Sequence, residues 1–392
     1  MAEAEPLLKI AVACSGLGHI RRGNEAWAQD LAETLRRHGA PVTLFGAGGV
    51  ANASVTIVPS LRRTGAAARM LARFFAPLGG WRYGFGSSYE IEQTTFAFGL
   101  WRKVWRDYDI IHVQDAVIAS IMDRLNRAGL CRARTILANG TDEPAARLRR
   151  LRYVQLLSPA MPRDWASDKT GGQLVFSVPN FVDLAVFHPG DRAAARRRFA
   201  LPEDALVVLC CAAIRKIHKR IDYLIREFAA FAAGQPSRQL VLVIAGGREA
   251  ETDEIVALGQ TLLAERVRCL VDLPRAMMPD LYRAADIFVL TSLVETFGIV
   301  LVEAMATGLP ILCHDSPHFL FVTGPASIRG DFSRPGGLAT ALVAVSQGDT
   351  SRRLAAVARP HVERNFSEAI VARQIIDMYQ RVATSDSRAI HG

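Results

Sequence analysis

Two series of short apolar strands, each alternating with helices, constrain the fold of this chain more than any other feature. The first series opens with the strand Leu8–Ala13, a glycine turn at Ser15–Gly18 and a helical pattern over Asn24–His38. Its later apolar runs are Val42–Phe45, Ile110–Val113, Arg134–Ala138 and Val154–Leu157. Because strands that alternate with helices are typical of a parallel sheet, the first half is predicted to form one α/β domain.

The second series follows a segment rich in proline and glycine, Val178–Gly190, which we interpret as a hinge. It begins with the strand Leu206–Ala213 and the helix Asp222–Ala233. Its further strands are Leu240–Ala245, Val267–Val271, Ile287–Thr291 and Pro310–Cys313. The sequence therefore predicts two domains of the same kind, residues 1–180 and 190–365, and a chain of 392 residues suits two ordinary cores.

The last segment, residues 366–392, contains an amphipathic helix over Phe366–Val382 and a tail. One helix is too short to form a domain, so its apolar face must pack on a part of the chain that is already folded.

Composition indicates a globular protein in a reducing compartment. Half of the residues are hydrophobic and 22% are charged, which suits a buried core rather than a disordered chain. The six cysteines form no C-x-x-C pair. The acidic start, Met1–Pro6, does not resemble a signal peptide, and no apolar run reaches the roughly 18 residues that cross a bilayer. We therefore expect a cytoplasmic protein.

The net charge of +9 makes a negatively charged partner plausible. Nucleotide diphosphates, anionic lipids and nucleic acids all have this property. No nucleic-acid-binding signature accompanies the charge, so we expect no nucleic-acid partner.

The glycine turn after the first strand is a candidate ligand loop. Gly16 and Gly18 let backbone amides approach an anion or a sugar. A nicotinamide dinucleotide fold would also place glycines here, but it needs a carboxylate near the end of the second strand. That strand ends Thr43–Gly46 without one, which disfavours a dehydrogenase.

The stretch Asp286–Pro310 reads as a buried strand, a polar loop, a helix and a glycine stop. Glu295 falls in the loop at the carboxyl end of the strand, where open α/β sheets bind ligands, and Glu303 falls on the helix. A carboxylate can accept from two hydroxyls of a ribose or a hexose, and free amides at Phe297 and Gly298 suit a diphosphate. Taken singly, ordinary loop and helix carboxylates explain the pattern equally well.

Taken whole, this stretch resembles the E-x7-E signature of the retaining nucleotide-sugar glycosyltransferases of family 4. Three other segments resemble that family in its order along the chain: Ser177–Pro189 its P-N-G-V-D segment, Lys219–Ile225 its K-G-x-D-x-L-I segment, and Val243–Gly247 its V-I-x-G-x-G strand end. The resemblance implies an α/β protein of GT-B architecture, with two facing Rossmann-like domains and a C-terminal helix that crosses back to the first.

The resemblance also implies roles for single residues. Lys219 would bind the donor diphosphate, Glu303 the ribose and Glu295 the transferred hexose, while Gly16 and Gly18 would face the donor from the other domain. A second cation upstream of the lysine would be Arg215, with Lys216 as its rival. The donor would be a UDP- or GDP-sugar, with no other cofactor and no essential metal. In retaining members no protein nucleophile is generally accepted, and the leaving phosphate is thought to take the acceptor's proton.

Several positions depart from the family pattern. Phe181 stands where glycine is usual, and Asn139-Gly140 stands where many relatives have a sugar-binding histidine. The sugar contact would then come from an amide. Asp107–Asp109 has the D-x-D form that another class uses for metal, but it precedes a strand and is interpreted as a loop.

Other polar residues leave two interpretations open. His19, Arg21 and Arg22 follow the glycine loop, and either bind a phosphate or are solvated. His112 and Asp115 flank Gln114 at a strand end, and a buried, satisfied histidine is the better account of His112. The basic and apolar segment Arg62–Arg73 either docks peripherally at the inner face of a membrane or packs on its own domain.

The sequence therefore predicts a glycosyltransferase whose acceptor, a lipid, glycan, protein or small molecule, is unidentified. Two alternatives share the architecture: a sugar-nucleotide epimerase, and a catalytically silent donor-binding partner of a larger assembly. A phosphorylase would need a pyridoxal-binding lysine and a longer chain.

Overall fold

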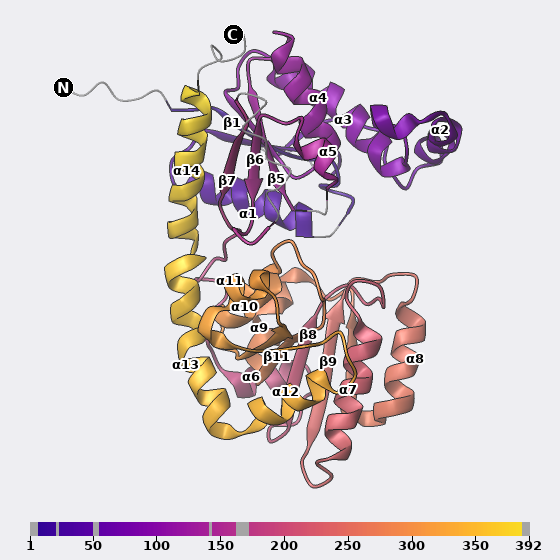
Figure 1. Ribbon diagram of the computed structural model, residues 1–392, viewed down its shortest axis with the longest axis vertical. Helices are drawn as coiled ribbons and strands as arrows, with labels where there is room; N and C mark the ends of the chain where they lie inside the picture. Colours follow the sequence, from indigo (N-terminus) through magenta and orange to yellow (C-terminus); the bar gives the residue numbers. More distant parts are fainter. Residues whose placement is uncertain (1–6, 21–22, 50–54, 141–142, 162–171, 386–392) are drawn as a thin grey trace, which may run out of the picture. The chain divides into compact units, whose positions relative to one another are not determined.

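The computed structural model describes residues 7–20, 23–49, 55–140, 143–161 and 172–385. The chain divides into two compact units, each an α/β structure (Figure 1). Unit 1 draws on residues 1–157, 161–178 and 372–392, and unit 2 on residues 158–160 and 179–371.

Unit 1 is built on a seven-stranded sheet, and all its strand pairs are parallel. Its order is β3 (Val55–Ile57), β2 (Val42–Gly46), β1 (Ile10–Cys14), β4 (Ile110–Val113), β5 (Arg134–Asn139), β6 (Tyr153–Leu156) and β7 (Leu174–Ser177). Every residue of β1, β4 and β6 is buried. Burial on both faces explains why these strands are continuous apolar runs rather than alternating ones.

The helical segments of unit 1 lie between these strands in the sequence. They are α1 (Gly23–Arg37), α2 (Ala66–Phe75), η1 (Ala76–Leu78), η2 (Gly80–Tyr83), α3 (Ser88–Val104), α4 (Ala116–Arg127) and α5 (Ala145–Leu148). Ser87 caps α3, because its hydroxyl accepts a hydrogen bond from the backbone N–H of Glu90 at 3.1 Å. In α2 only Ala68 is buried, so this helix contributes little to the core.

Unit 2 repeats the design with a six-stranded parallel sheet. Its order is β10 (Val267–Val271), β9 (Leu240–Gly246), β8 (Leu206–Cys211), β11 (Ile287–Leu290), β12 (Ile311–His314) and β13 (Ser327–Gly330). Its helical segments are α6 (Arg192–Arg198), α7 (Ile221–Ala233), α8 (Thr252–Leu263), η4 (Ala264–Arg266), η5 (Arg275–Met277), α9 (Met278–Ala284), α10 (Ile299–Ala306), α11 (Pro317–Thr323), η6 (Gly324–Ala326), α12 (Gly337–Ser346) and α13 (Gly348–Asn365).

The last helix, α14 (Glu368–Thr384), returns to unit 1, as the sequence predicts. Its part from Ala372 onward belongs to that unit and lies beside the first sheet (Figure 1). The hydroxyl of Tyr379 lies 2.8 Å from Nδ1 of His112, and the Arg134 guanidinium binds the last carbonyls of the helix. An apolar stripe at helical spacing is buried in this contact: Ala372, Ile375, Met378, Tyr379 and Val382.

The predicted start of this helix is wrong by two residues. Phe366 caps α13 with a non-helical φ of −133°, and α14 begins at Glu368. The Phe366 ring is buried in unit 2, where its centroid lies 5.7 Å from that of Phe297. The aromatic side chain therefore belongs to the core of unit 2, and its backbone breaks the helical pattern.

Candidate functional site

In unit 2, the candidate residues gather at the carboxyl ends of β8 and β11. Lys219 lies in the loop between β8 and α7, and Glu295 lies in the loop between β11 and α10. The Lys219 ammonium donates directly to the Glu295 carboxylate. The Thr291 hydroxyl, just after β11, also donates to the Lys219 carbonyl at 2.7 Å. Two loops that are distant in sequence are thus tied together at one edge of the sheet.

The loop that carries Lys219 has a strained backbone. His218 and Arg220, on either side of the lysine, both have left-handed φ values, 68° and 53°. Such values cost a residue with a side chain about 1 kcal/mol or more. Arg220 occupies the position where family 4 has glycine. Its guanidinium donates to the Phe332 carbonyl and stacks 4.2 Å from the centroid of the Tyr223 ring, contacts that compensate the strain.

Glu303 is a buried carboxylate on α10, with 4% of its surface exposed. The hydroxyl of Tyr282, on α9, donates to its Oε2 at 2.7 Å, and the Arg275 guanidinium lies 3.8 Å from its Oε1. Burial and the neighbouring Glu303 raise the pKa of Tyr282 well above its usual value, so the phenol keeps its proton and donates. Sequence reasoning missed Tyr282, although a tyrosine in the helix before the strand is a visible signal.

Arg215 and Lys216 differ in whether their side chains already have acidic partners. The Lys216 ammonium pairs with Glu254, and its backbone N–H donates to Glu251 at 2.8 Å. Within the described part of the chain, the Arg215 guanidinium has no acidic partner, and its buried Nε has no hydrogen-bond acceptor. The arrangement favours Arg215 as the cation that is available to a ligand.

The loop before α10 could contact a ligand through its backbone N–H groups rather than through its side chains. Phe297 is 2% exposed, so its side chain belongs to the core. Gly298 has a φ of 79°, which suits glycine, and it precedes the first turn of α10. Nε2 of His318 lies 3.1 Å from the Phe297 carbonyl, and burial lowers the pKa of this histidine. No motif in the sequence points to His318.

In unit 1, the two loop glycines are closely packed. A Cβ on Gly16 would lie 2.0 Å from Oε1 of Glu25, and one on Gly18 would lie 2.0 Å from the Gly48 backbone. Gly18 also has a φ of 93°. Gly18 must therefore be glycine for the fold of unit 1, whereas a side chain at Gly16 would require the Glu25 carboxylate to move.

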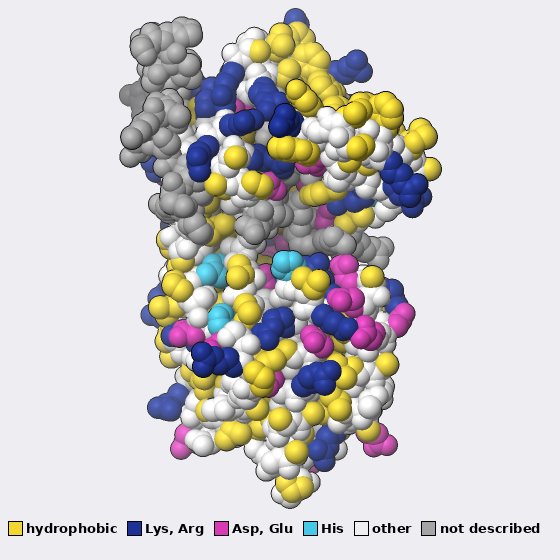
Figure 2. Space-filling model, turned by 45° about the vertical axis from the view of Figure 1, so that its right-hand side comes forward, with side chains coloured by type: hydrophobic (Ala, Val, Ile, Leu, Met, Phe, Trp, Pro, Cys, Tyr) yellow, Lys and Arg dark blue, Asp and Glu magenta, His cyan; other side chains and the backbone are white. Residues whose placement is uncertain are grey.

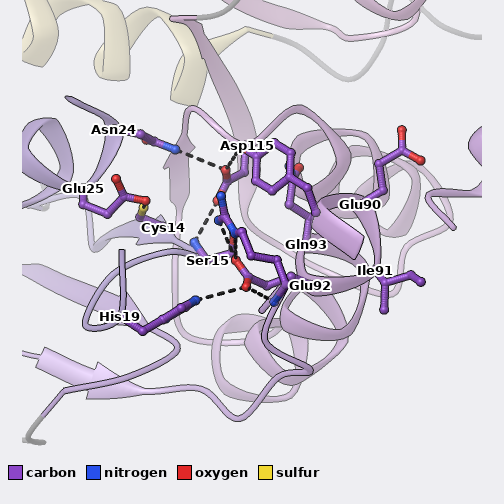
Figure 3. A network of polar contacts seen from close by, with 12 residues as sticks. Cys14, Ser15, His19, Asn24, Glu25, Glu90, Ile91, Glu92, Gln93 and Asp115 are labelled. Atoms are coloured by element: carbon purple, nitrogen blue, oxygen red, sulfur yellow. Dashed lines mark hydrogen bonds and ion pairs between the residues drawn. The ribbon is translucent and has the colours of Figure 1, made fainter. Parts of the chain in front are cut away.

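Asp115 organises the polar residues behind this loop (Figure 3). It accepts hydrogen bonds from the Ser15 backbone N–H at 2.7 Å, from the Asn24 amide at 3.1 Å and from the Tyr89 hydroxyl at 3.0 Å. Its carboxylate is 1% exposed. Asp115 therefore holds the glycine loop against α1 and α3, a role its sequence position does not reveal.

Glu92, on α3, forms a second centre in the same network (Figure 3). It accepts from the Arg63 Nε at 2.8 Å, and it lies 3.0 Å from the His19 ring. Burial alone would raise the pKa of Glu92, but the hydrogen bonds from Arg63 outweigh it and lower that pKa. The His19 ring is thus positioned by the Glu92 carboxylate. Arg21 and Arg22 lie outside the described residues.

Of the other polar candidates, His112 and Asp109 have local partners, and Asn139 is buried. His112 is fully buried, and its ring packs edge-on against Trp27 with centroids 5.1 Å apart, as well as against Tyr379. Burial lowers its pKa to about 3. Asp109 accepts from the Lys9 backbone N–H at 2.9 Å and pairs with Arg132. The Asn139 amide is buried at the end of β5, and its Oδ1 has no hydrogen-bond partner in the described chain.

Residues 191–330, within unit 2, match the family of glycosyl transferases group 1. A D-inositol 3-phosphate glycosyltransferase of Catenulispora acidiphila is 34% identical over 233 residues, which cover 55% of this chain and 52% of that one. A D-inositol 3-phosphate glycosyltransferase of Actinosynnema mirum is 34% identical over 200 residues, covering 47% and 48%. The chain spans about half the length of the curated relatives it matches.

Solved structures match nearly the whole chain. Sucrose-phosphate synthase from Thermosynechococcus elongatus aligns with a TM-score of 0.76 at 19% identity, over 97% of this chain and all of that one (100%). Anabaena HepE, solved in complex with UDP-glucose, aligns with a TM-score of 0.71 at 17% identity, over 95% and 99%.

The fold is that of the GT-B glycosyltransferases. Residues 191–330 of unit 2 are similar to the glycosyl transferases group 1, and the GT-B fold that the sequence predicts is confirmed.

Proposed function

We propose that this protein transfers a hexose from a UDP- or GDP-sugar to an acceptor, with retention of the anomeric configuration. The observation that carries the proposal is the pairing of Lys219 with Glu295 at the carboxyl end of the second sheet, with the buried Glu303 on the adjoining helix. This edge is where open α/β sheets bind their ligands.

In this proposal, Lys219 and Arg215 bind the donor diphosphate. When the bond between the sugar C1 and the phosphate oxygen breaks, its electron pair stays on the phosphate, which gains negative charge. A fixed cation stabilises this charge more strongly in the transition state than in the ground state. Backbone N–H groups in the first turn of α10, after Phe297 and Gly298, also donate hydrogen bonds to this developing negative charge.

Glu303 is proposed to bind the ribose. A carboxylate can accept from two neighbouring hydroxyls, and burial strengthens these hydrogen bonds by excluding water. Because the hydroxyl of Tyr282 already holds one of its oxygens, the carboxylate is fixed in orientation before the donor arrives. Tyr282 is therefore a positioning residue.

Glu295 is proposed to contact the transferred hexose. Its present partner is Lys219, so donor binding would exchange one ion pair for two new contacts, lysine to diphosphate and glutamate to sugar hydroxyls. In the retaining reaction the acceptor oxygen bonds to C1 on the face that the phosphate leaves, and the leaving phosphate takes the acceptor's proton. No protein nucleophile is needed for this step.

Gly16 and Gly18 are proposed to present backbone N–H groups to the donor. Within the part of the chain that the structure describes, the Gly18 N–H donates to no other residue, whereas the Gly16 N–H is directed at the Cys14 sulfur and would have to leave it for the donor. Because backbone packing already explains the missing side chain of Gly18, the proposal for that residue depends on its N–H donor alone.

The acceptor of this chain is not assigned. The curated relatives are named for D-inositol 3-phosphate, and these names apply to those proteins. Two other functions fit the same donor site: a sugar-nucleotide epimerase, and a binding partner without turnover. Neither is favoured by a residue of the site.

A donor panel tests the proposal. The protein is incubated with UDP- and GDP-linked hexoses, and the products are followed by mass spectrometry. Transfer or slow hydrolysis that releases the nucleoside diphosphate supports a glycosyltransferase, and NMR of the product sugar reports retention. Interconversion of the donor sugar without release supports the epimerase, and binding without any reaction supports the silent partner.

A further inference from the structure

Unit 1 has a large groove away from the candidate site in unit 2. It encloses about 1080 Å³ and is lined by η2, by α4 and by the segment from Pro144 to Arg152. Seven arginines line it: Arg82, Arg124, Arg127, Arg147, Arg149, Arg150 and Arg152. Asp123 is the one acidic residue in its described lining. Such a surplus of one charge creates a strong positive potential.

Some of these arginines are neutralised and others are not. Arg127 and Arg152 pair with Asp123, and Arg147 pairs with Glu90 and Glu143. Among the described residues, no ion-pair partner exists for the exposed side chains of Arg82, Arg124, Arg149 and Arg150. The ion-paired arginines stabilise the local structure. The other four keep an uncompensated positive charge that is exposed to solvent.

An exposed apolar surface borders the groove. Trp81 and Tyr83 of η2 line it and are 59% and 70% exposed. Met70, Phe74 and Leu78, on α2 and η1 just upstream, are also more than half exposed. Figure 2 shows Lys and Arg side chains gathered on unit 1 next to hydrophobic ones. We call the four unpaired arginines and these five residues the basic–apolar face.

We propose that the basic–apolar face docks the protein on the surface of an anionic phospholipid bilayer. Arginines attract the headgroup phosphates, tryptophan and tyrosine prefer the headgroup level, and the aliphatic residues enter the acyl boundary. A nucleic acid would also use arginines and aromatic rings, but it offers no apolar phase to Met70 and Leu78. Among the described residues no helix is long and apolar enough to cross a bilayer.

This face overlaps the basic segment that the sequence singles out, because Met70 lies within Arg62–Arg73, where Arg69 and Arg73 are also exposed. Arg63, in that segment, is committed to Glu92 and does not contribute its charge. The unpaired charge that lines the groove comes instead from Arg82, Arg124, Arg149 and Arg150, on three separate segments. The proposal is independent of glycosyl transfer, because membrane docking needs no donor.

The test is flotation of the full-length protein with vesicles of phosphatidylcholine alone or mixed with phosphatidylglycerol. One variant combines Arg124→Gln, Arg149→Gln and Arg150→Gln. A matched control combines Arg226→Gln, Arg268→Gln and Arg353→Gln, which removes the same charge from exposed positions of unit 2 that form no ion pair with any residue the structure describes. A third variant, Leu78→Ser with Trp81→Ala, removes apolar surface and keeps the charge. Circular dichroism confirms that each is folded.

The wild type and the control are expected to float with the phosphatidylglycerol vesicles and not with the neutral ones. Each arginine near an anionic surface strengthens partitioning about fivefold, so the groove variant is expected to lose about a hundredfold. The apolar variant is expected to weaken binding as well, and about 0.5 M salt to reduce that of the wild type. Equal binding by the groove variant and the control would overturn the proposal. The proposal would also be overturned if the wild type did not bind vesicles. It would be overturned as well if the groove arginines were needed for binding to single-stranded RNA and not for binding to vesicles.

Discussion

At the scale of single residues, the loop around Lys219 combines a strained backbone with compensating side-chain contacts. Arg220 has a φ of 53°, a value that glycine adopts without strain. Arg220→Ala keeps the strain and loses both the Phe332 hydrogen bond and the Tyr223 stacking. Arg220→Gly loses the same contacts but releases the strain, so it should be more stable than the alanine variant by about 1 kcal/mol. Urea unfolding of the two variants measures this difference, and an alanine variant of equal or higher stability would refute it.

Tyr282 provides a second test at this scale. Tyr282→Phe removes the hydroxyl that donates to Glu303 and leaves the packing of the ring intact. A hydrogen bond to a charged group contributes about 1.5–3 kcal/mol, so affinity for the nucleoside diphosphate should fall roughly 10- to 100-fold. Calorimetric titration measures it. Unchanged affinity in a folded variant would mean that Tyr282 does not position Glu303.

At the scale of secondary-structure elements, α14 joins unit 1 through the buried contact of Tyr379 with His112. The pKa of His112 is about 3 in the folded protein, against about 6.5 in an unfolded chain. Between these values the unfolded state binds a proton that the folded state does not, so stability is full above pH 6.5 and falls with decreasing pH. The slope from this residue is about 1.4 kcal/mol per pH unit.

His112→Phe should remove this slope from the pH dependence of urea unfolding between about pH 6 and pH 4. The control is His38→Gln, at an exposed position of α1's carboxyl end, which should leave the slope in place. A wild-type slope that persists in the His112 variant would show that another group is responsible.

Removal of most of α14 tests the same contact. A chain that ends after Val371 keeps all of unit 2, including Phe366, and lacks the part of α14 that covers His112 and binds the Arg134 guanidinium. Unit 1 should therefore melt at a lower temperature, because its apolar surface is exposed. Fluorescence of Trp27 and its neighbours in unit 1 follows this melting, and an unchanged transition would contradict the packing of α14.

Elements that the sequence predicts well are those whose signal is local. The apolar run of β4 coincides with its predicted bounds, because full burial requires continuous hydrophobicity. The bounds of the edge strand β10 also coincide, although only Val267 of that strand is buried. The short strands β3, β7 and β13 were not predicted, since three or four residues with partial burial carry no clear pattern. The helix α13 was missed because polar residues and Pro360 obscure its periodicity.

At the scale of the whole molecule, the sequence could name candidate residues such as Lys219 and Glu295 but not how they pair. Lys219 and Glu295 are 76 residues apart, and only the order of the strands β8 and β11 brings their loops together. In the same way, the arginines of the basic–apolar face come from three separate segments of unit 1. Spatial pairing of this kind requires the tertiary fold.

The central claim is that Lys219, Glu295 and Glu303 bind different parts of one donor, and alanine variants of each test it most directly. Calorimetric binding of the free nucleoside diphosphate is measured beside the steady-state transfer rate. Lys219→Ala should lower turnover about 100-fold or more, with a smaller loss of nucleotide affinity.

Glu303→Ala should weaken the nucleotide itself, because it loses ribose hydrogen bonds that exist before and during the reaction. Glu295→Ala should transfer poorly yet bind the free nucleotide at least as well as the wild type, because its loss releases Lys219. Loss of nucleotide binding in Glu295→Ala, or wild-type binding and rate in Glu303→Ala, would contradict this division of the site.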